Sequence, residues 1–207
     1  MRVAVIGASG RTGRATVKYA LAAGLDVVSV VRSPSSAPEG TTVAQADARD
    51  HEALAAGVKG ADAVVSCLGH VASDQDPTVL QDGATALVAA MASVEVSRLV
   101  AVSAAGAFVA GDDPLSRFVA KPILDRVLRA NNEDTRAMET VIRASDMSWT
   151  LLRPSRLIAG DGRVGYRCRL DASVWWHYNT TFDTAGRAAV DAISKPDWAG
   201  HAVFITE

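Results

Sequence analysis

The chain has 207 residues, about the length of one domain. Its 21 Lys and Arg against 23 Asp and Glu give a formal net charge of -2, which argues against a nucleic-acid partner. With 49% hydrophobic and 21% charged residues, we expect a folded globular chain rather than a disordered one. No run of 18 apolar residues occurs, so we expect no membrane span.

The first element predicted is a buried strand over Arg2–Ile6, because a short apolar run ends at a glycine. That glycine comes too early for a signal peptide. An amphipathic helix follows over Thr12–Ala23 and is ended by Gly24. The sequence therefore begins with a strand, a glycine-rich turn and a helix.

The turn between them reads G-x-x-G-x-x-G. Its glycines would let the backbone approach a pyrophosphate, and the free N–H groups of the helix start would stabilise the negative charge. The alternative is a tight turn that binds nothing. Because strand, spacing and helix agree, we predict dinucleotide binding. The residues concerned are Gly7, Ser9, Gly10, Arg11, Thr12 and Gly13.

A second strand is predicted over Val27–Val31 and ends at Arg32-Ser33. An acidic residue at this point would bind the ribose 2′-hydroxyl of NAD, whereas a guanidinium suits a 2′-phosphate. We therefore expect NADP(H), although a solvated surface arginine would look the same. After a third strand over Thr42–Ala46, Asp47 is expected either to bind adenine or to cap a helix beginning near His51.

Two further strands bring polar groups to the same edge of the predicted sheet. The strand over Ala63–Cys67 continues into Leu68-Gly69, with His70 as a weak candidate acid beyond it. We interpret Cys67 as a small buried group rather than a reactive thiol. Neither Cys67 nor Cys168 belongs to a C-x-x-C pair, which favours a reducing, cytoplasmic compartment.

The second of these strands spans Leu99–Val102 and is preceded by a helical pattern from Val79 to Met91. Its following residue, Ser103, is a candidate to contact a substrate carbonyl or a carboxamide. The alternative is a serine that satisfies a backbone group at the strand end. Ala101 stands where a nucleophile elbow requires glycine, so a hydrolase is disfavoured.

Beyond Ser103 the pattern predicts two helical stretches, Leu115–Arg129 and Glu133–Ala144, interrupted near Asn131 and Asn132. A sixth strand over Trp149–Leu152 then runs into a turn fixed by Pro154. Arg153 is expected to pair with a carboxylate such as Glu139 or to serve a phosphate. Ser155 and Arg156 are expected to face the pocket, with Arg156 as a candidate catalytic residue.

The segment Gly160–Thr180 shows no clear period, and a last strand is predicted over Ala202–Ile205. Its aromatic residues would roof a pocket, form a dimer surface or belong to the core; they are Tyr166, Trp175, Trp176 and Tyr178, with His177 among them. Together the elements predict an α/β, Rossmann-type doubly wound parallel sheet with a small loop-rich substrate lobe. We expect one domain over residues 1–207, with 155–182 as the lobe.

The motifs GASGRTG, VSCLG, VAVSAAG and SWTLLRPSRL, with Arg32 and Asp47, resemble the atypical short-chain dehydrogenase/reductases that carry an NAD(P)H-binding, NmrA-like domain. Within them, the flavin reductase and biliverdin-IXβ reductase group looks most similar. The resemblance implies that Ser9 to Thr12 contact phosphates and that Arg32 meets the 2′-phosphate. It also implies contacts to adenine from Asp47 and Ala48, to the ribose from Leu68 and Gly69, and to nicotinamide from Ser103 and Pro154.

One departure bears on the reaction. Typical short-chain dehydrogenases use a Tyr-x-x-x-Lys pair as acid, and none of Tyr19, Tyr166 and Tyr178 has lysine at that spacing. The flavin reductase relatives lack the pair too, and place a histidine where this chain has Arg156.

We therefore expect an NADPH-dependent reductase that transfers hydride to a planar conjugated acceptor such as a flavin, a quinone or a polyketide-like aromatic. One alternative is an NADP(H)-sensing regulatory protein. Another is a tailoring enzyme without net redox chemistry: an epimerase, dehydratase or cyclase. The histidines are dispersed, so no metal site is predicted. We expect a monomer or homodimer.

Overall fold

The computed structural model describes residues 1–70, 77–108, 114, 118, 126, 128–162 and 165–207. An eight-stranded sheet forms the centre, with strand order β3-β2-β1-β4-β5-β6-β10-β8. Seven strands run parallel and β8 pairs antiparallel with β10 at one edge. The predicted Rossmann-type α/β fold is therefore confirmed, with the correction that its last edge strand is antiparallel.

The strands of this sheet are β1 Arg2–Ile6, β2 Asp26–Val31, β3 Thr42–Gln45, β4 Ala63–Ser66, β5 Arg98–Val102, β6 Ser148–Pro154, β8 Arg167–Leu170 and β10 Ala202–Thr206. The helices are α1 Arg11–Ala22, α2 His51–Val58, α3 Val79–Ser93, α5 Arg129–Arg143 and α6 Phe182–Ile193, with short 3₁₀ turns at η1 Pro34–Ser36, η2 Ala105–Ala107 and η4 Pro196–Trp198. Strands β7 Arg156–Ile158 and β9 Asn179–Thr181 form a separate parallel pair.

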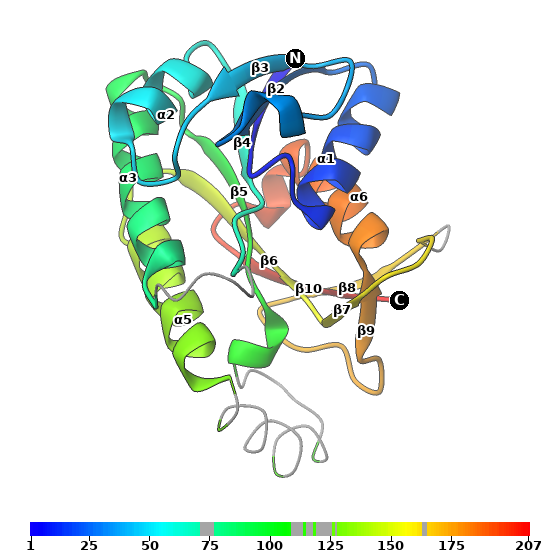
Figure 1. The fold of residues 1–207 in the computed structure, drawn as a ribbon. Helices are drawn as coiled ribbons and strands as arrows, with labels where there is room; N and C mark the ends of the chain where they lie inside the picture. Colours follow the sequence, from blue (N-terminus) through cyan, green and yellow to red (C-terminus); the bar gives the residue numbers. More distant parts are fainter. Residues whose placement is uncertain (71–76, 109–113, 115–117, 119–125, 127, 163–164) are drawn as a thin grey trace.

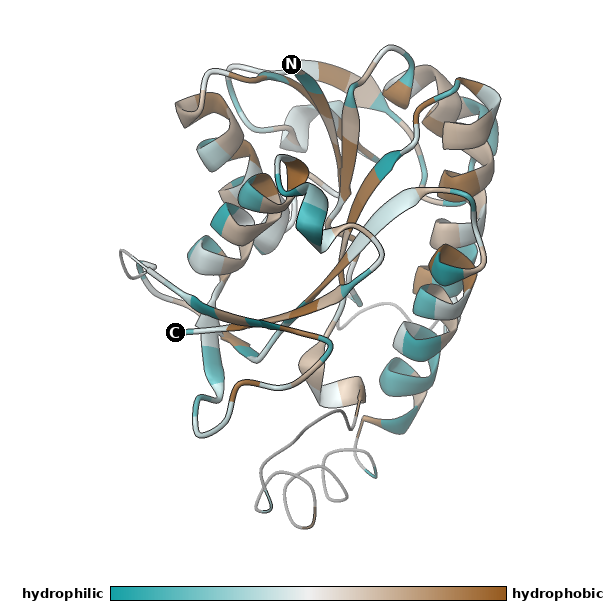
Figure 2. Ribbon diagram, turned by 180° about the vertical axis from the view of Figure 1, so that it is seen from behind, coloured by the Kyte–Doolittle hydropathy of each residue, from teal (hydrophilic) through white to brown (hydrophobic). Residues whose placement is uncertain are grey.

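Helices cover both faces of the sheet, with α1 and α6 on one side and α2, α3 and α5 on the other (Figure 1). Alternate strand residues enter the two cores: Ala4 and Ile6 of β1 pack in the layer of α2, α3 and α5, whereas Val3 and Val5 pack against α1 and α6. Both faces of the central strands are buried, so β1, β2, β4 and β5 are mainly apolar. Figure 2 shows these strands predominantly hydrophobic at the centre of the molecule.

The chain changes direction in the middle of the sheet. From β1 it builds β2 and β3 on one side, then crosses to place β4 on the other side of β1. The carboxyl ends of β1 and β4 therefore lie on either side of a topological switch point, where open α/β sheets bind their ligands. In Figure 1 this edge faces the part of the chain that carries β7 and β9.

The segment Gly160–Thr180 is more regular than we expected. Its residues Arg167–Leu170 form β8, which pairs with β10 through Leu170 and Val203, and β9 begins at Asn179. The segment thus contains two short strands that we did not predict. Strand β8 forms because it pairs with the free edge of β10. That partner is distant in the sequence, so local periodicity does not predict the strand.

The helix α5 also differs from expectation. It begins at Arg129 and runs without a break through Asn131 and Asn132 to Arg143, so the predicted interruption there is wrong. Asn132 is buried, and tertiary packing has overridden the low helix propensity of asparagine. The other predicted stretch, Leu115–Arg129, lies mostly outside the described residues. Among the residues that the structure describes, no helix is long and apolar enough to cross a membrane.

Candidate functional site: a nucleotide-binding edge of the sheet

The glycine-rich turn passes too close to its neighbours for side chains. At Gly7, with φ +73°, a Cβ would lie 3.1 Å from the carbonyl oxygen of Cys67 at the end of β4. At Gly13 a Cβ would lie 2.2 Å from the carbonyl oxygen of Gly7. The turn is closed by a hydrogen bond of 3.0 Å from the N–H of Gly10 to the same carbonyl. At Gly7 and Gly13 only backbone therefore fits between β1, α1 and the end of β4.

The start of α1 is left without the usual capping groups. Gly10 is the N-cap and offers no side-chain hydrogen bond, and no acidic residue lies in the first turn. The N–H groups of a first helical turn have no intrahelical acceptor, so this turn presents donors and a positive dipole end to an anion. The guanidinium of Arg11 lies beside it, 4.1 Å from the ring centroid of Phe182. The cradle of glycines and donors fits a diphosphate.

The second strand ends at a serine-rich turn that carries the predicted Arg32. Arg32 and Ser33 are exposed. The hydroxyl oxygens of Ser33 and Ser35 are 3.1 Å apart, and the hydroxyl of Ser36 donates to the carbonyl of Ser33 at 2.6 Å. This turn offers a guanidinium and hydroxyls at the carboxyl end of β2, and the contact with a 2′-phosphate stays a prediction.

Sequence reasoning missed Arg14, which joins these two turns. Its Nε donates to the carbonyl of Ser9 at 3.0 Å and its Nη2 to the carbonyl of Ser36 at 2.9 Å. The available signal was a second arginine directly after the last glycine, in a helical turn that has no acid.

Asp47 does not cap α2. Its carboxylate accepts the backbone N–H of Arg49 at 3.0 Å, whereas Asp50 is the N-cap and accepts the N–H of Ala53 at 3.0 Å. Of the two predicted roles, the cap is therefore wrong and the contact to adenine stays a prediction. Asp47 is exposed after β3.

Ala48 and Leu68 lie together over α3. A Cβ on Gly83 would stand 2.9 Å from Leu68 Cδ1 and 3.6 Å from Ala48 Cβ. The glycine in α3 therefore leaves room for these two residues. Gly69 follows them and has open space where a side chain would be.

The thiol of Cys67 is an inert group in this setting. Its Sγ lies 3.4 Å from the hydroxyl oxygen of Thr16, and burial raises the pKa of the thiol to about 11, although the contact with Thr16 lowers it slightly. A thiol of this pKa is protonated at neutral pH and a poor nucleophile.

His70, the weak candidate acid, faces a buried carboxylate. Its Nε2 lies 3.4 Å from Oδ2 of Asp134, which is fully buried on α5. The carboxylate of Asp134 also accepts the N–H groups of Leu80 and Gln81, each at 2.9 Å, and so caps α3 from a different helix. Asp134 thus fixes the start of α3 and lies beside the ring of His70 without a hydrogen bond to it.

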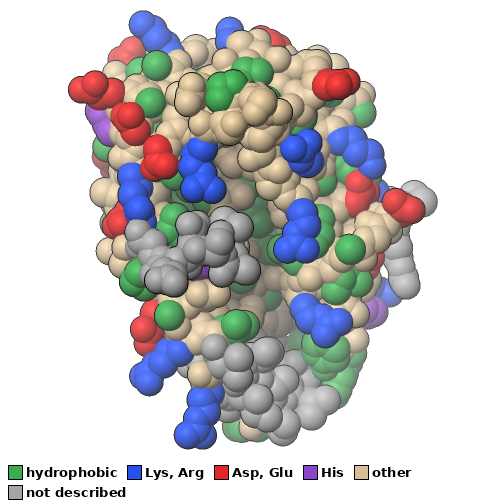
Figure 3. All heavy atoms as spheres, in the orientation of Figure 1, with side chains coloured by type: hydrophobic (Ala, Val, Ile, Leu, Met, Phe, Trp, Pro, Cys, Tyr) green, Lys and Arg blue, Asp and Glu red, His purple; other side chains and the backbone are tan. Residues whose placement is uncertain are grey.

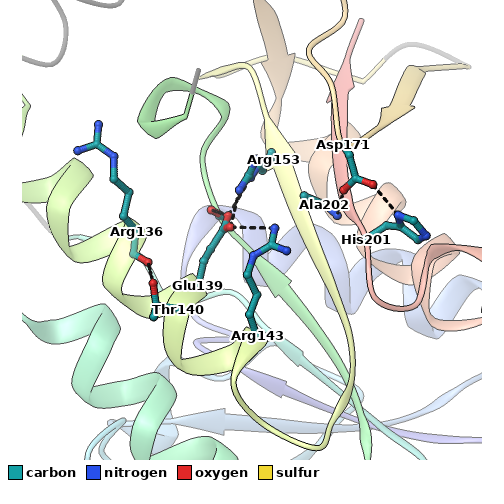
Figure 4. A network of polar contacts seen from close by, with 9 residues as sticks. Arg136, Glu139, Thr140, Arg143, Arg153, Asp171, His201 and Ala202 are labelled. Carbon is teal, nitrogen blue, oxygen red and sulfur yellow. Dashed lines mark hydrogen bonds and ion pairs between the residues drawn. The ribbon is translucent and has the colours of Figure 1, made fainter. Parts of the chain in front are cut away.

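Ser103 belongs to a buried charge network at the ends of β5 and β6. Its hydroxyl donates to Glu139 at 2.6 Å, and Arg153 donates to both oxygens of the same carboxylate, at 2.9 and 2.5 Å. Arg143 approaches from one turn further along α5, at 3.5 Å, whereas Arg136 points away (Figure 4). The predicted pairing of Arg153 with Glu139 is confirmed.

This network changes the interpretation of Ser103. Its proton is held by Glu139, so the hydroxyl does not satisfy a backbone group and is not free to donate to a substrate carbonyl. Its lone pairs remain able to accept from an amide N–H. Pro154 ends β6 next to it and is buried.

Arg156 and Ser155 separate after the proline. The hydroxyl of Ser155 points to the backbone carbonyls of His177 and Ile205, at 3.3 and 3.4 Å. Arg156 opens β7, where its N–H donates to the carbonyl of Tyr178 and its side chain is exposed. Ser155 is therefore engaged within the fold, whereas Arg156 is accessible.

The late aromatic residues divide between core and surface. Tyr166 packs against the α1 and α6 layer and donates to Asp191 at 2.7 Å, and burial raises its pKa. Trp175, Trp176 and Tyr178 are exposed. Tyr19, the remaining tyrosine, donates to Asp183.

Figure 3 shows this face of the molecule hollowed in its middle, with Lys and Arg side chains on both sides. Among the described residues, no three His, Cys, Asp or Glu side chains are grouped to hold a metal ion. A parallel sheet with a switch point, a glycine cradle at the first helix and a basic serine-rich turn after the second strand define a Rossmann-type dinucleotide-binding protein.

Comparison with known proteins gives the family. The chain belongs to the NAD(P)H-binding family, whose model matches residues 7–196. The NAD(P)H-binding part of the predicted resemblance is thereby confirmed. This chain is 27% identical over 164 residues to the uncharacterized protein YwnB of Bacillus subtilis, which covers 79% of this chain and 76% of YwnB. It is 35% identical over 104 residues to protein Rv2047c of Mycobacterium tuberculosis, half of this chain but only 12% of Rv2047c.

Solved structures share the fold at low sequence identity. A short-chain dehydrogenase/reductase from Veillonella parvula, solved in complex with NADP, has a TM-score of 0.82 and 16% identity, covering 100% of this chain and 94% of that one. ChuY, an anaerobilin reductase from Escherichia coli, has a TM-score of 0.80 and 18% identity, covering 100% and 97%.

Proposed function

We propose that this protein is an NADPH-dependent oxidoreductase that transfers hydride to a planar conjugated acceptor such as a flavin, a quinone or a polyketide-like aromatic. The family supports a nicotinamide cofactor. The acceptor class is inferred from the hydrogen bonds that three hydroxyl groups make within the protein. Ser103, Tyr19 and Tyr166 each donate to a carboxylate, so none of them serves as the proton donor that a simple carbonyl substrate needs.

The residues of the sheet edge would hold the cofactor as follows. The turn from Gly7 to Gly13 and the first turn of α1 take the diphosphate, and Arg32 with Ser33 takes the 2′-phosphate. Asp47 and Ala48 flank adenine, Cys67 to Gly69 lie along the ribose, and Ser103 with Pro154 borders the nicotinamide. When bound, the nicotinamide supplies a hydride.

An acceptor with an extended π-system stabilises the added electrons itself and takes its proton from solvent, so the protein mainly positions it. Ser103 orients the carboxamide by accepting its N–H, because Glu139 holds the serine proton. Arg156 is one of the exposed cations of the lobe, with Arg167 and Arg169, and is assigned to the charge that develops on the acceptor. We place the protein in the cytoplasm, as monomer or homodimer; both cysteines are free thiols.

The experiment is NADPH oxidation by the purified protein with a panel of flavins and quinones. Turnover of at least one acceptor is expected, together with loss of turnover in Arg156→Ala. Tight binding of NADPH without turnover of any panel member would refute the acceptor class.

Cofactor choice has its own test. Arg32→Glu places a carboxylate where the 2′-phosphate is assigned, so NADPH binding should weaken by at least 10-fold and NADH should then bind as well as NADPH, since a charge-assisted contact contributes about 1.5–3 kcal/mol. An unchanged preference would show that Arg32 does not contact the phosphate.

A second candidate is an NADP(H)-sensing regulatory protein. The same engaged hydroxyls favour it, because a sensor needs no proton donor. It predicts NADPH binding without oxidation and a protein partner whose capture depends on the cofactor. A tailoring enzyme of the same fold would instead convert substrate without net loss of NADPH.

A further inference from the structure

Arg14 occupies the space between the two turns that form the nucleotide site. It stands in the first turn of α1, and its planar guanidinium contacts Ser9 of the glycine-rich turn with one nitrogen and Ser36 of the serine-rich turn with another. The side chain of Arg14 thus reaches a turn 22 positions further along the chain.

The guanidinium is not saturated by these contacts. An arginine has five N–H donors, and two of them are used here, so about three remain. The side chain is exposed, and among the described residues no carboxylate pairs with it. Its charge is therefore held at a fixed place without a partner of opposite sign.

The position of that charge follows from its acceptor. Ser36 ends η1, and its hydroxyl closes back onto Ser33. The guanidinium of Arg14 therefore borders the turn whose opening residues are Arg32 and Ser33. Two guanidiniums, one from α1 and one from the end of β2, are brought to this turn, and the hydroxyl pair of Ser33 and Ser35 lies within it.

We propose that Arg14 is a second specificity-determining residue for the 2′-phosphate of NADPH, held in position by the carbonyls of Ser9 and Ser36. The proposal rests on the proposed function, because it concerns the same nucleotide site. Arg14 contacts the phosphate with its remaining N–H groups, and Arg32 contacts it from the other turn. The fixed fork reduces the side-chain entropy lost on binding.

A purely structural role predicts something different. If Arg14 only held the two turns together, its removal would loosen the whole site and weaken NADPH and NADH alike. A direct role affects only ligands that carry the 2′-phosphate. The two roles are therefore separated by matched ligand pairs.

The experiment is isothermal titration calorimetry on the full chain with four probes: NADPH, NADH, 2′,5′-ADP and 5′-ADP. In Arg14→Met, the affinities for NADPH and 2′,5′-ADP should fall about 10- to 100-fold, as expected for a lost charge-assisted hydrogen bond, while those for NADH and 5′-ADP change by less than about 3-fold. Arg14→Lys keeps the charge without the fork and should lower the NADPH-to-NADH preference by a smaller factor. Arg129→Met, an exposed arginine of α5 remote from the turn, is the matched control and should change nothing.

Equal weakening of both members of either ligand pair overturns the proposal, and so does an unchanged affinity of Arg14→Met for 2′,5′-ADP. Thermal unfolding of each variant shows whether it is folded. If Arg14→Met does not fold, Arg14→Lys tests the proposal alone, and an unchanged NADPH-to-NADH preference in that variant overturns it. If the unaltered chain binds neither NADPH nor NADH, the proposed function is overturned, and this inference with it.

Discussion

Glu139 provides the sharpest test of the energetics of this fold. Its carboxylate is 1% exposed and accepts from Ser103 and twice from Arg153, whose own side chain is 7% exposed. Glu139→Ala removes the counter-charge and leaves Arg153 buried and unpaired. Loss of one partner of a buried ion pair lowers the free energy of unfolding by about 3–5 kcal/mol.

The measurement is urea unfolding and calorimetric melting of the purified variant. For a chain of this length, each kcal/mol corresponds to about 2–4 °C, so Glu139→Ala should melt about 6–20 °C lower than the parent. The double variant Glu139→Leu with Arg153→Met removes both charges and should recover most of that loss, because a hydrophobic pair of similar volume often replaces a buried ion pair without cost.

A matched control lies on the same helix. Glu133 pairs with Arg129, four residues before it on the helix, at 3.0 Å, but both side chains are mostly exposed, so Glu133→Ala should change the free energy of unfolding by less than about 1 kcal/mol. The reasoning is refuted if Glu139→Ala costs no more than Glu133→Ala. It is also refuted if the double variant is as unstable as Glu139→Ala alone.

Three more outcomes are expected. Gly13→Ala should abolish NADPH binding, because its Cβ would lie 2.2 Å from a backbone carbonyl, whereas Gly106→Ala, with open space, should bind normally in the same titration. At pH 8 a thiol reagent should label Cys168 rapidly and Cys67 only on unfolding. Burial raises the pKa of Cys67 to about 11, so roughly one Cys67 thiol in a thousand is ionised at this pH. Rapid labelling of Cys67 in the folded Cys168→Ser variant would contradict this. Burial alone would raise the pKa of Asp183, but hydrogen bonds from Lys18 and Tyr19 of α1 lower it, so the ionised carboxylate stabilises the fold above pH about 4 and this stabilisation is lost below. The difference in melting temperature between the parent and Asp183→Asn should therefore disappear on acidification. A difference that stays constant with pH would be inconsistent with that pairing.

The sequence predicted those parts of the fold that are buried on both sides. The strands β1, β2, β4 and β5 are mainly apolar because helices cover both faces, and such runs can be recognised in the sequence. Strand β8 could not be found this way, because all four of its residues are exposed and its place depends on pairing with β10.

The candidate site shows the same division between local and long-range information. The glycine cradle is local, since Gly7, Gly10 and Gly13 are spaced by the turn itself. Glu139 was considered as the partner of Arg153 because it lies within a predicted helical stretch. The hydrogen bond from Ser103 to Glu139 spans 36 residues, and no local sequence pattern predicts it. Arg14 was overlooked because its contacts join two turns whose proximity exists only after folding.

The close passage of the first helix against the last has a consequence for the order of folding. A Cβ on Gly186 would lie 2.6 Å from the backbone and Cβ of Ala15, and Lys18 reaches Asp183 across 165 positions. During synthesis α1 emerges well before α6, the helix that covers its inner side. Contacts of such sequence separation form slowly, so the nascent chain exposes an apolar face on α1 until α6 has been made. A ribosome-bound chain stopped before Phe182 should accordingly bind chaperones, whereas a released chain that includes α6 should not.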